Sequence, residues 1–322
     1  MQDMIIEMAP MEGITTATFR RVYMKWFTGI DRVYTPFLVA NQTHRFKTRE
    51  KREIEHCSPA LIPQILTDRA EHFIWAAALL KKAGYTEINL NAGCPSATVT
   101  TKRKGAGMLR DLSSLRSFFD EVFSAGKAQD LPEISVKTRV GVSSYDEASD
   151  IADLYAAYPL SCVIVHPRIS DDLYEHTPNR EAFGAFYDRI PHERLIYNGD
   201  LKTVADTEAI LAAFPGIRGV MIGRGLLADP FLPRRTKSHD PRKDAGFSAD
   251  DRSTMLGFLG ELYDAYESDL SEGTALLKMK DLWNFIAPSF PGKDRQLKAI
   301  RKSRSGMEYK HAVETLMGTL LC

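Results

Sequence analysis

Short apolar runs rich in β-branched residues alternate with amphipathic segments along residues 1–230, and this alternation restricts the possible folds more than any other feature. The runs predict eight strands, at residues 4–8, 32–36, 60–64, 87–90, 134–137, 162–166, 194–197 and 219–222. Near-continuous apolar runs of this length are typical of parallel strands that helices cover on both faces. Eight strand–helix units in this length favour a closed (β/α)8 TIM barrel over an open, doubly wound sheet.

Capping and stop residues place helices between some of these strands. Helices are predicted over 68–84, with Asp68 as the cap, over 112–126 and over 203–215. The segment 91–110 shows no such pattern and is predicted to be a long polar loop. It follows the carboxyl end of the fourth strand, which is the end where barrel enzymes keep their chemistry.

The last third of the chain reads as a separate helical region. A polar stretch at 233–246 predicts a linker. Ser248 and Asp251 predict the cap of the helix that follows. We therefore expect a catalytic barrel domain over 1–235 and a small C-terminal helical domain over 247–322.

The charges of the chain balance, with 42 basic and 42 acidic residues. No net field attracts the protein to nucleic acid or to an anionic membrane, so a polyanion would have to meet a local patch. The composition, with 44% hydrophobic and 26% charged residues, excludes intrinsic disorder.

The four cysteines form no C-x-x-C pair and no metal-binding spacing. Reduced thiols in a cytoplasmic protein are the simplest interpretation. The sequence opens without a signal-peptide pattern and has no apolar run long enough to cross a membrane. We expect a cytoplasmic monomer with no bound metal, and no protein partner is implied.

Polar residues stand at the ends of nearly all the predicted strands, where packing alone would favour apolar ones. In a barrel these ends meet around one mouth, so the residues predict a binding site there. They include Glu12, Gln64, Asn91, Lys137, Arg139, His166, Asn198, Asp200 and Arg224.

Glycine-containing turns follow the seventh and eighth strands, at 198–200 and 223–225. Turns at these positions of a barrel often bind phosphate through backbone N–H groups. Either turn alone would be explained by chain geometry, but the two together favour phosphate. Residues 223–228 also match G-x-G-x-x-A, which we discount because no βαβ unit follows.

Three strand-end side chains could contact a cofactor. Lys137 could form a Schiff base or hold negative charge on a bound cofactor. Gln64 offers a donor and an acceptor to a planar heterocycle. For His166, a ligand contact and a purely structural role are equally supported.

Cys94 is the candidate on which the chemistry depends most. Gly93 and Pro95 flank it within the predicted loop and argue for an exposed thiol. An unperturbed thiol has a pKa of roughly 8.5 and is protonated at neutral pH, so it can donate a proton without a special environment. Action as a nucleophile would require activation, and the sequence indicates no histidine partner.

Two basic stretches predict contact with a polyanion. Lys102, Arg103 and Lys104 lie in the same loop as Cys94. Residues 293–310 contain seven basic and two acidic residues, a net charge of +5 in a chain that is neutral overall. Segregated charge of this kind is typical of a nucleic-acid contact, although a solvated loop is the alternative for the first stretch.

Taken together and in this order, four segments resemble the tRNA-dihydrouridine synthases. They read APMEG at 9–13, NLNAGCP at 89–95, KTRVG at 137–141 and GRG at 223–225. The helical tail is similar to the RNA-binding domain of that family. The resemblance implies an FMN-dependent barrel that reduces the C5–C6 bond of a uridine in tRNA, with NADPH, or NADH, as the reductant.

The resemblance also implies roles for residues. Reduced flavin would give hydride to C6 and Cys94 would protonate C5. FMN would be held by Pro10, Met11, Glu12, Gln64, Lys137, His166, Asn198, Gly199, Asp200, Gly223 and Arg224. Asn91 and Arg139 would face the uridine. Lys278, Lys280, Lys298 and Arg301 would meet tRNA phosphates.

The sequence departs from the family pattern after the sixth strand, where His166-Pro167-Arg168-Ile169 replaces His-Gly-Arg-Thr. Pro167 removes a backbone N–H and so changes the contacts available there. Three other functions remain as alternatives: a small-molecule FMN oxidoreductase of the dihydroorotate or enoate type, a Schiff-base lyase built on Lys137, and a non-catalytic RNA-binding protein.

Overall fold

The computed structural model describes residues 4–56, 58–238 and 247–318. The chain forms two compact units. The barrel unit consists of Met1–Pro10, Asp31–Asp200 and Thr207–Ile222. The helical unit consists of Met11–Ile30, Leu201–Asp206 and Gly223–Cys322.

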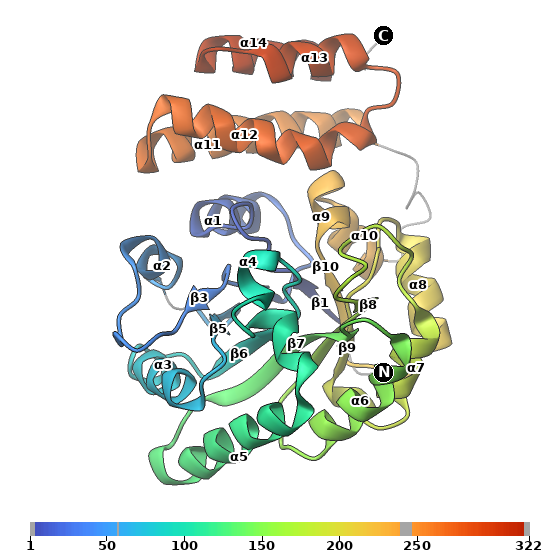
Figure 1. Cartoon of the computed structure of the whole chain (residues 1–322). Helices are drawn as coiled ribbons and strands as arrows, with labels where there is room; N and C mark the ends of the chain where they lie inside the picture. The colour runs from blue at the N-terminus through green and yellow to red at the C-terminus, as the bar shows by residue number, and fades with distance from the viewer. Residues whose placement is uncertain (1–3, 57, 239–246, 319–322) are drawn as a thin grey trace. The chain divides into compact units, whose positions relative to one another are not determined.

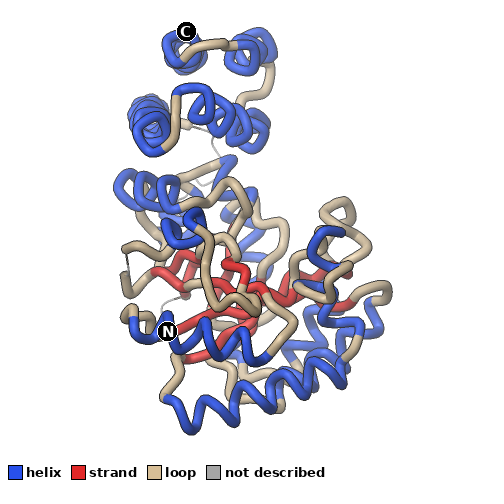
Figure 2. Tube along the Cα trace, turned by 60° about the vertical axis from the view of Figure 1, so that its left-hand side comes forward, coloured by secondary structure: helices blue, strands red, loops and turns tan. Residues whose placement is uncertain are grey.

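The barrel unit is built on a parallel sheet whose strands lie inside its helices (Figures 1 and 2). The strands are β1 (Ile5–Met8), β2 (Arg32–Tyr34), β3 (Leu38–Val39), β4 (Leu61–Ile62), β5 (Gln64–Leu66), β6 (Glu87–Ala92), β7 (Glu133–Gly141), β8 (Val163–Ile169), β9 (Leu195–Tyr197) and β10 (Gly219–Ile222). Their order is β3-β5-β6-β7-β8-β9-β10-β1-β2-β4.

Pairing around β4 and β5 completes the circle of strands. Only Pro63 separates β4 from β5, because a proline has no N–H to give to the ladder. β4 pairs with β2 on one side, while β5 pairs with β6 on the other. The segments β2–β3 and β4–β5 thus each occupy one strand position, and the predicted eight-stranded barrel is confirmed.

Helices of the strand–helix repeat follow the strands along the chain. They are α2 (Thr48–Glu53), α3 (Ala70–Lys82), α4 (Ala97–Thr100), α5 (Leu112–Gln129), α6 (Ala148–Ala156), α7 (Arg180–Tyr187) and α8 (Val204–Ala213). The three predicted helices are present as α3, α5 and α8.

Three details of the prediction are wrong. The N-cap of α3 is Arg69 without a side-chain bond, so Asp68 is not the cap. Helix α5 continues past Gly126 to Gln129, and the space beside Gly126 is open. The predicted loop 91–110 contains α4 and a 3-10 helix, η1 (Gly105–Arg110).

Charged residues are buried at the amino end of the barrel interior. Arg32 and Glu87 form an ion pair of 2.7 Å between β2 and β6. Tyr34 donates to Oε2 of the fully buried Glu7 over 2.9 Å. Burial raises the pKa of Glu7 to about 8, so this carboxyl is largely protonated at neutral pH. Oε1 of Glu7 and Oε1 of Glu87 have no hydrogen-bond partner among the described residues.

The helical unit contains α1 (Ala17–Trp26), α9 (Arg224–Ala228), α10 (Leu232–Ser238), α11 (Ala249–Asp269), α12 (Glu272–Ile286), α13 (Asp294–Lys302) and α14 (Gly306–Gly318). Ser248 caps α11 and accepts from the N–H of Asp251, as predicted. Phe258 of α11 packs against Phe27, just after α1, with ring centres 4.9 Å apart. This contact places α1 in the helical unit, although the sequence predicted it within the barrel domain.

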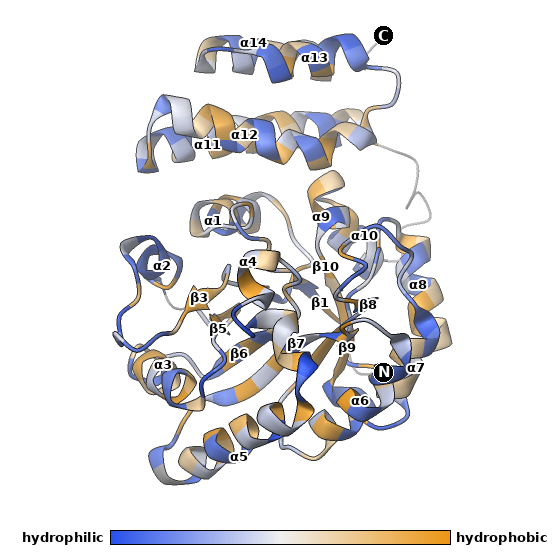
Figure 3. Ribbon diagram, viewed as in Figure 1, coloured by the Kyte–Doolittle hydropathy of each residue, from blue (hydrophilic) through white to orange (hydrophobic). Residues whose placement is uncertain are grey.

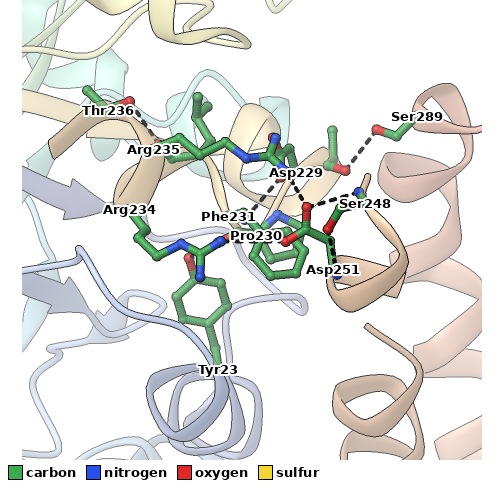
Figure 4. Close-up of polar contacts among 12 residues, drawn as sticks. Tyr23, Asp229, Pro230, Phe231, Arg234, Arg235, Thr236, Ser248, Asp251 and Ser289 are labelled. Carbon is green, nitrogen blue, oxygen red and sulfur yellow. Dashed lines mark hydrogen bonds and ion pairs between the residues drawn. The ribbon is translucent and has the colours of Figure 1, made fainter. Parts of the chain in front are cut away.

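The start of the predicted linker is helical. Residues 233–238 belong to α10, and residues 239–246 lie outside the described residues. Arg235, 6% exposed, bonds Asp229 over 2.7 Å and Asp251 over 3.0 Å (Figure 4). These two pairs fasten α10 to α11, because the carboxylates come from the segments on either side.

Candidate active site

Neighbouring strands bring three of the predicted site residues together at the carboxyl end of the barrel. The parallel register sets Gln64 of β5 beside Asn89 of β6, and Asn91 of β6 beside Lys137 of β7. Asn89 and Asn91 lie on the same face of β6, because side chains of a strand alternate between its two faces.

These amides form a buried chain of hydrogen bonds. Asn91 donates to Oε1 of Gln64 over 2.7 Å, and Gln64 donates to Oδ1 of Asn89 over 2.8 Å. Asn89 in turn donates to Ser135 of β7 over 3.0 Å. Gln64 is only 1% exposed, so the chain fixes the orientation of its amide.

The turn that carries Cys94 is held by Asn91. Oδ1 of Asn91 accepts from the N–H of Gly93 over 3.2 Å and from the N–H of Cys94 over 2.9 Å. Cys94 is half-buried and, within the described residues, is not disulfide-bonded. The side chain of Asn91 therefore positions the thiol, a role that the sequence did not predict.

The segment after α4 folds back against this turn. The N–H of Ala106 donates to the carbonyl of Cys94 over 3.0 Å. Gly105 has a φ of +56°, and a Cβ there would lie 2.7 Å from the carbonyl oxygen of Cys94. Glycine is required at this position, because any side chain would displace the cysteine turn.

Lys137 lies inside β7, not at its end, because the strand continues to Gly141. The side chain is half-buried. Loss of hydration lowers the pKa of Lys137 to about 8, helped by the charge of Arg139 and opposed by Cys94. In the part of the chain that the structure describes, its ammonium group makes no ion pair and no hydrogen bond. A ligand acceptor could therefore bind it.

Arg139 is 1% exposed and bonds main-chain carbonyls on both sides of β7. It donates to Gly93 over 3.2 Å, to Ile169 over 2.6 Å, and to Leu173. Its guanidinium lies 5.2 Å from the ring centre of Tyr174. Arg139 thus ties the cysteine turn to the segment after β8.

An ion pair between Arg168 and Asp200 involves one of the two turns predicted to bind phosphate, the turn at 198–200. Arg168, 1% exposed, bonds the carboxylate of Asp200 over 2.6 and 3.3 Å. The same guanidinium lies 2.8 Å from Nε2 of His166. Because arginine only donates, Nε2 accepts and the imidazole proton is assigned to Nδ1. In the sequence, Arg168 stands out only as part of the segment 166–169. Its position two residues from His166, which places it on the same strand face, was the available signal.

The turn at 198–200 is explained by packing within the barrel unit. Asn198 donates to the carbonyl of Met221 over 2.8 Å and so links β9 to β10. A Cβ on Gly199 would lie 2.4 Å from the hydroxyl of Tyr197. The role of these residues in phosphate binding stays a prediction.

Four of the remaining predicted residues, Met11, Glu12, Gly223 and Arg224, belong to the helical unit. Met11 donates from its N–H to Thr15 over 2.8 Å, Glu12 is exposed, and Pro10 precedes them at the edge of the barrel unit. Gly223 and Arg224 begin α9, where a Cβ on Gly225 would lie 1.9 Å from the carbonyl oxygen of Leu201.

The four cations predicted to meet RNA fall into two groups. Lys278 and Lys280 donate to the carbonyls of Gly13, over 2.7 Å, and Ser303, over 2.6 Å. Lys298 and Arg301 are exposed on α13, a helix with mostly hydrophilic residues (Figure 3). The exposed pair on α13 is the better placed to bind a polyanion.

Within residues 4–56, 58–238 and 247–318, no helix is both long and apolar enough to cross a lipid bilayer. No cluster of three or more His, Cys, Asp or Glu residues there could bind a metal ion.

Known proteins resemble this chain in sequence. The family model described as "Dihydrouridine synthase (Dus)" matches residues 7–314. A Staphylococcus aureus (strain Mu50) protein named "Probable tRNA-dihydrouridine synthase" is 30% identical over 277 residues, covering 81% of this chain and 78% of that protein. The "tRNA-dihydrouridine(16) synthase" of Salmonella typhimurium is 31% identical over 252 residues, covering 74% and 78%.

Solved structures resemble the fold at low sequence identity. Morphinone reductase superposes with a TM-score of 0.52 at 13% identity, covering 74% of this chain and 87% of that one. A variant of NCR from Zymomonas mobilis gives a TM-score of 0.50 at 16% identity, with 73% and 87% covered. Likeness at this identity supports the barrel architecture alone.

Proposed function

This chain belongs to the dihydrouridine synthase family, a family of flavin-dependent oxidoreductases, and we propose that it reduces the C5–C6 bond of a uridine in tRNA, with FMN as cofactor and NADPH as reductant. The observation that carries the proposal is the cysteine turn. Asn91 holds Cys94 beside Lys137, at the end of the barrel where enzymes of this architecture react.

The side chains of the barrel unit suit a flavin. FMN, when bound and reduced by NADPH, would supply the hydride that reduces C6 of the uracil ring. The ammonium of Lys137, without a protein partner among the described residues, would bind the flavin edge where negative charge grows on reduction. Gln64 and Nδ1 of His166 add donors at the same end of the barrel. Pro10, Met11, Glu12, Asn198, Gly199, Asp200, Gly223 and Arg224 remain proposed FMN contacts.

Cys94 is the proposed proton donor. Hydride addition at C6 leaves an electron pair that C5 shares with the O4 carbonyl, and the thiol proton goes to C5. The thiolate that remains is negatively charged, and Lys137 is near enough for the two charges to interact. Water then reprotonates the sulfur and restores the thiol, and NADPH must supply two further electrons before another uridine is reduced.

Recognition of RNA is assigned to exposed cations. A uridine within folded tRNA must leave its stack to reach a barrel mouth. Phosphate contacts hold the RNA meanwhile, and Lys298 and Arg301 on α13 are exposed for this purpose. We place the reaction in the cytoplasm with its tRNA substrate.

A pair of variants tests the assignment. Cys94→Ala should keep bound flavin and tRNA affinity but lower dihydrouridine formation by about 10²–10⁴-fold, the contribution of a general acid. Lys137→Met should instead weaken flavin binding, measured by the visible absorbance of the purified protein. Dihydrouridine is quantified by nucleoside mass spectrometry. Its position is mapped by comparing tRNA from a strain that lacks this protein with tRNA from the parent strain.

The outcomes separate the possibilities. Turnover by Cys94→Ala at the wild-type rate would remove Cys94 as proton donor. Colourless wild-type protein that takes up no added FMN would refute the cofactor. Flavin-dependent NADPH oxidation with small enones but not with tRNA would assign the barrel to the small-molecule alternative.

A further inference from the structure

A pocket of about 540 Å³ opens on the barrel unit, between the segment that follows β3 and the amino-terminal part of α3. Arg45, Lys47 and Lys104 line it together with His72, Phe46 and neutral polar residues at 41–43. None of the lining residues is acidic. This volume is large enough for a nucleotide-sized group.

The charges around the pocket favour an anion. Arg45 and Lys47 are exposed. The side chain of Lys104 is 17% exposed, and its Nζ lies 3.8 Å from Asp68, a long contact for an ion pair. Three cations therefore line the pocket. Of the carboxylates nearby, Asp68 approaches Lys104, while Glu50 accepts from the main-chain N–H groups of Val39 and Lys47. The exposed side chains of Arg45 and Lys47 thus leave a positive field at the pocket.

His72 provides a second, independent observation. His72 is 9% exposed, and its Nδ1 is buried without a hydrogen-bond partner among the described residues. Its Nε2 lies 3.2 Å from Glu71. A buried nitrogen without a partner costs free energy. Because Nε2 faces a carboxylate, which only accepts, Nδ1 of the neutral imidazole is an acceptor, and a ribose hydroxyl of a nucleotide in the pocket would supply the missing bond.

Aromatic rings flank the cations. The ring of His44 stacks on Trp75, with ring centres 5.2 Å apart and planes inclined by 7°. Phe46 packs against the same indole at 5.0 Å. His44 is exposed and has a φ of +50°, a strained backbone conformation for a residue with a side chain. Bases of single-stranded RNA stack on rings of this kind beside phosphate-binding cations.

The pocket is connected to the cysteine turn through the chain itself. Lys104 immediately precedes Gly105, which packs against Cys94, and Ala106, which donates to the carbonyl of Cys94. A ligand that fixes Lys104 thus also restrains the segment that supports Cys94.

We propose that this pocket binds a backbone phosphate of the tRNA at a nucleotide other than the reduced uridine, with the base of that nucleotide stacking near His44. The inference rests on the proposed function, because it assigns a second contact to the same substrate. RNA is favoured over free phosphate because cations, flat rings and the cysteine segment occur at one place.

The test compares two double variants of the full-length, flavin-loaded protein. Arg45→Ala/Lys47→Ala removes two pocket charges. Lys82→Ala/Lys127→Ala removes two exposed charges near the carboxyl ends of α3 and α5 and serves as the matched control. Binding of fluorescent tRNA is measured by anisotropy over a series of salt concentrations.

The pocket variant should bind tRNA about tenfold more weakly, and the slope of log K against log salt should fall by roughly one to two, as expected for lost phosphate contacts. The control should match the wild type in both quantities. His72→Phe, which keeps a ring but removes the nitrogen, should weaken binding by about threefold. Equal affinity and slope for the pocket variant and the control would overturn the proposal.

Calorimetry with inorganic phosphate separates the two sources of the anion. If wild-type protein binds phosphate, the pocket variant does not, and their tRNA affinities are equal, the pocket takes free phosphate and the RNA assignment is wrong. If wild-type protein neither binds tRNA nor forms dihydrouridine, the proposed function itself fails. If the wild-type protein is active and the pocket variants behave like the control, only the proposal about the pocket is refuted.

Discussion

Buried polar side chains occupy both ends of the barrel interior, but their hydrogen bonding differs. At the carboxyl end, Asn91, Gln64 and Asn89 are linked in one chain. At the amino end, Glu7 and Glu87 each keep an oxygen without a partner among the described residues. The comparison teaches that the carboxyl end orients groups for a ligand, whereas the amino end limits its buried charge by keeping Glu7 protonated.

The largest expected effect concerns the ion pair between Arg168 and Asp200 at the carboxyl end of the barrel. Arg168→Met should lower the free energy of unfolding by about 3 kcal/mol, because it leaves Asp200 without its cation. This loss is at the low end of the range for removing one partner of a buried ion pair, because the Asp200 side chain is 29% exposed. Urea denaturation measures it. Asp200→Asn in the same background should recover part of the stability; no recovery would mean that Arg168 acts by packing.

The second largest effect concerns the orientation of the Cys94 thiol. Asn91→Ala removes the acceptor for Cys94 N–H and the donor to Gln64, so the thiol loses its position. We expect single-turnover dihydrouridine formation to slow by about 10²-fold while flavin stays bound. The matched control is Asn89→Ala, which is equally buried and bonds the same Gln64 but not Cys94. Equal losses in both variants would show that the whole chain of amides, and not Asn91, positions the thiol.

The smallest effect concerns Glu7 and depends on pH. Its pKa is about 8 in the folded protein against 4.5 for an ordinary glutamate, so the folded state keeps a proton that the unfolded state releases. Wild-type stability should therefore fall as pH rises between these two pKa values, and by at most about 1.4 kcal/mol over the single unit from pH 6 to pH 7 in which it is measured. Glu7→Gln should flatten this decline in a series of urea unfolding curves. An unchanged slope would locate the titration elsewhere.

The sequence predicted strand positions well because apolar runs mark them directly. It placed the end of β7 too early, since Lys137 and Arg139 interrupt the apolar pattern although the strand continues to Gly141. It missed the bond between Glu7 and Tyr34, because nothing local links residues 27 positions apart. Helix α1 was likewise assigned to the barrel, because its packing on α11 depends on residues more than 200 positions away.

The candidate site was predicted in its residue types but not in its connections. The motif around Cys94 marked the thiol, yet only the fold shows that Asn91 holds the turn. The two glycine turns predicted phosphate binding, whereas Gly199 is explained by the ring of Tyr197. Lys278 and Lys280 looked like the other cations of the tail, but each bonds a carbonyl within the helical unit.

The amide chain at the carboxyl end also has a direction. It begins at an N–H of residue 94, which can only donate, and passes through three side-chain amides and Ser135 to the carbonyl of Ile88, which can only accept. Neither terminus can reverse, so every dipole between them is aligned head to tail. The main chain thereby fixes the orientation of each amide. Flipping any one amide would place two donors, or two acceptors, opposite each other.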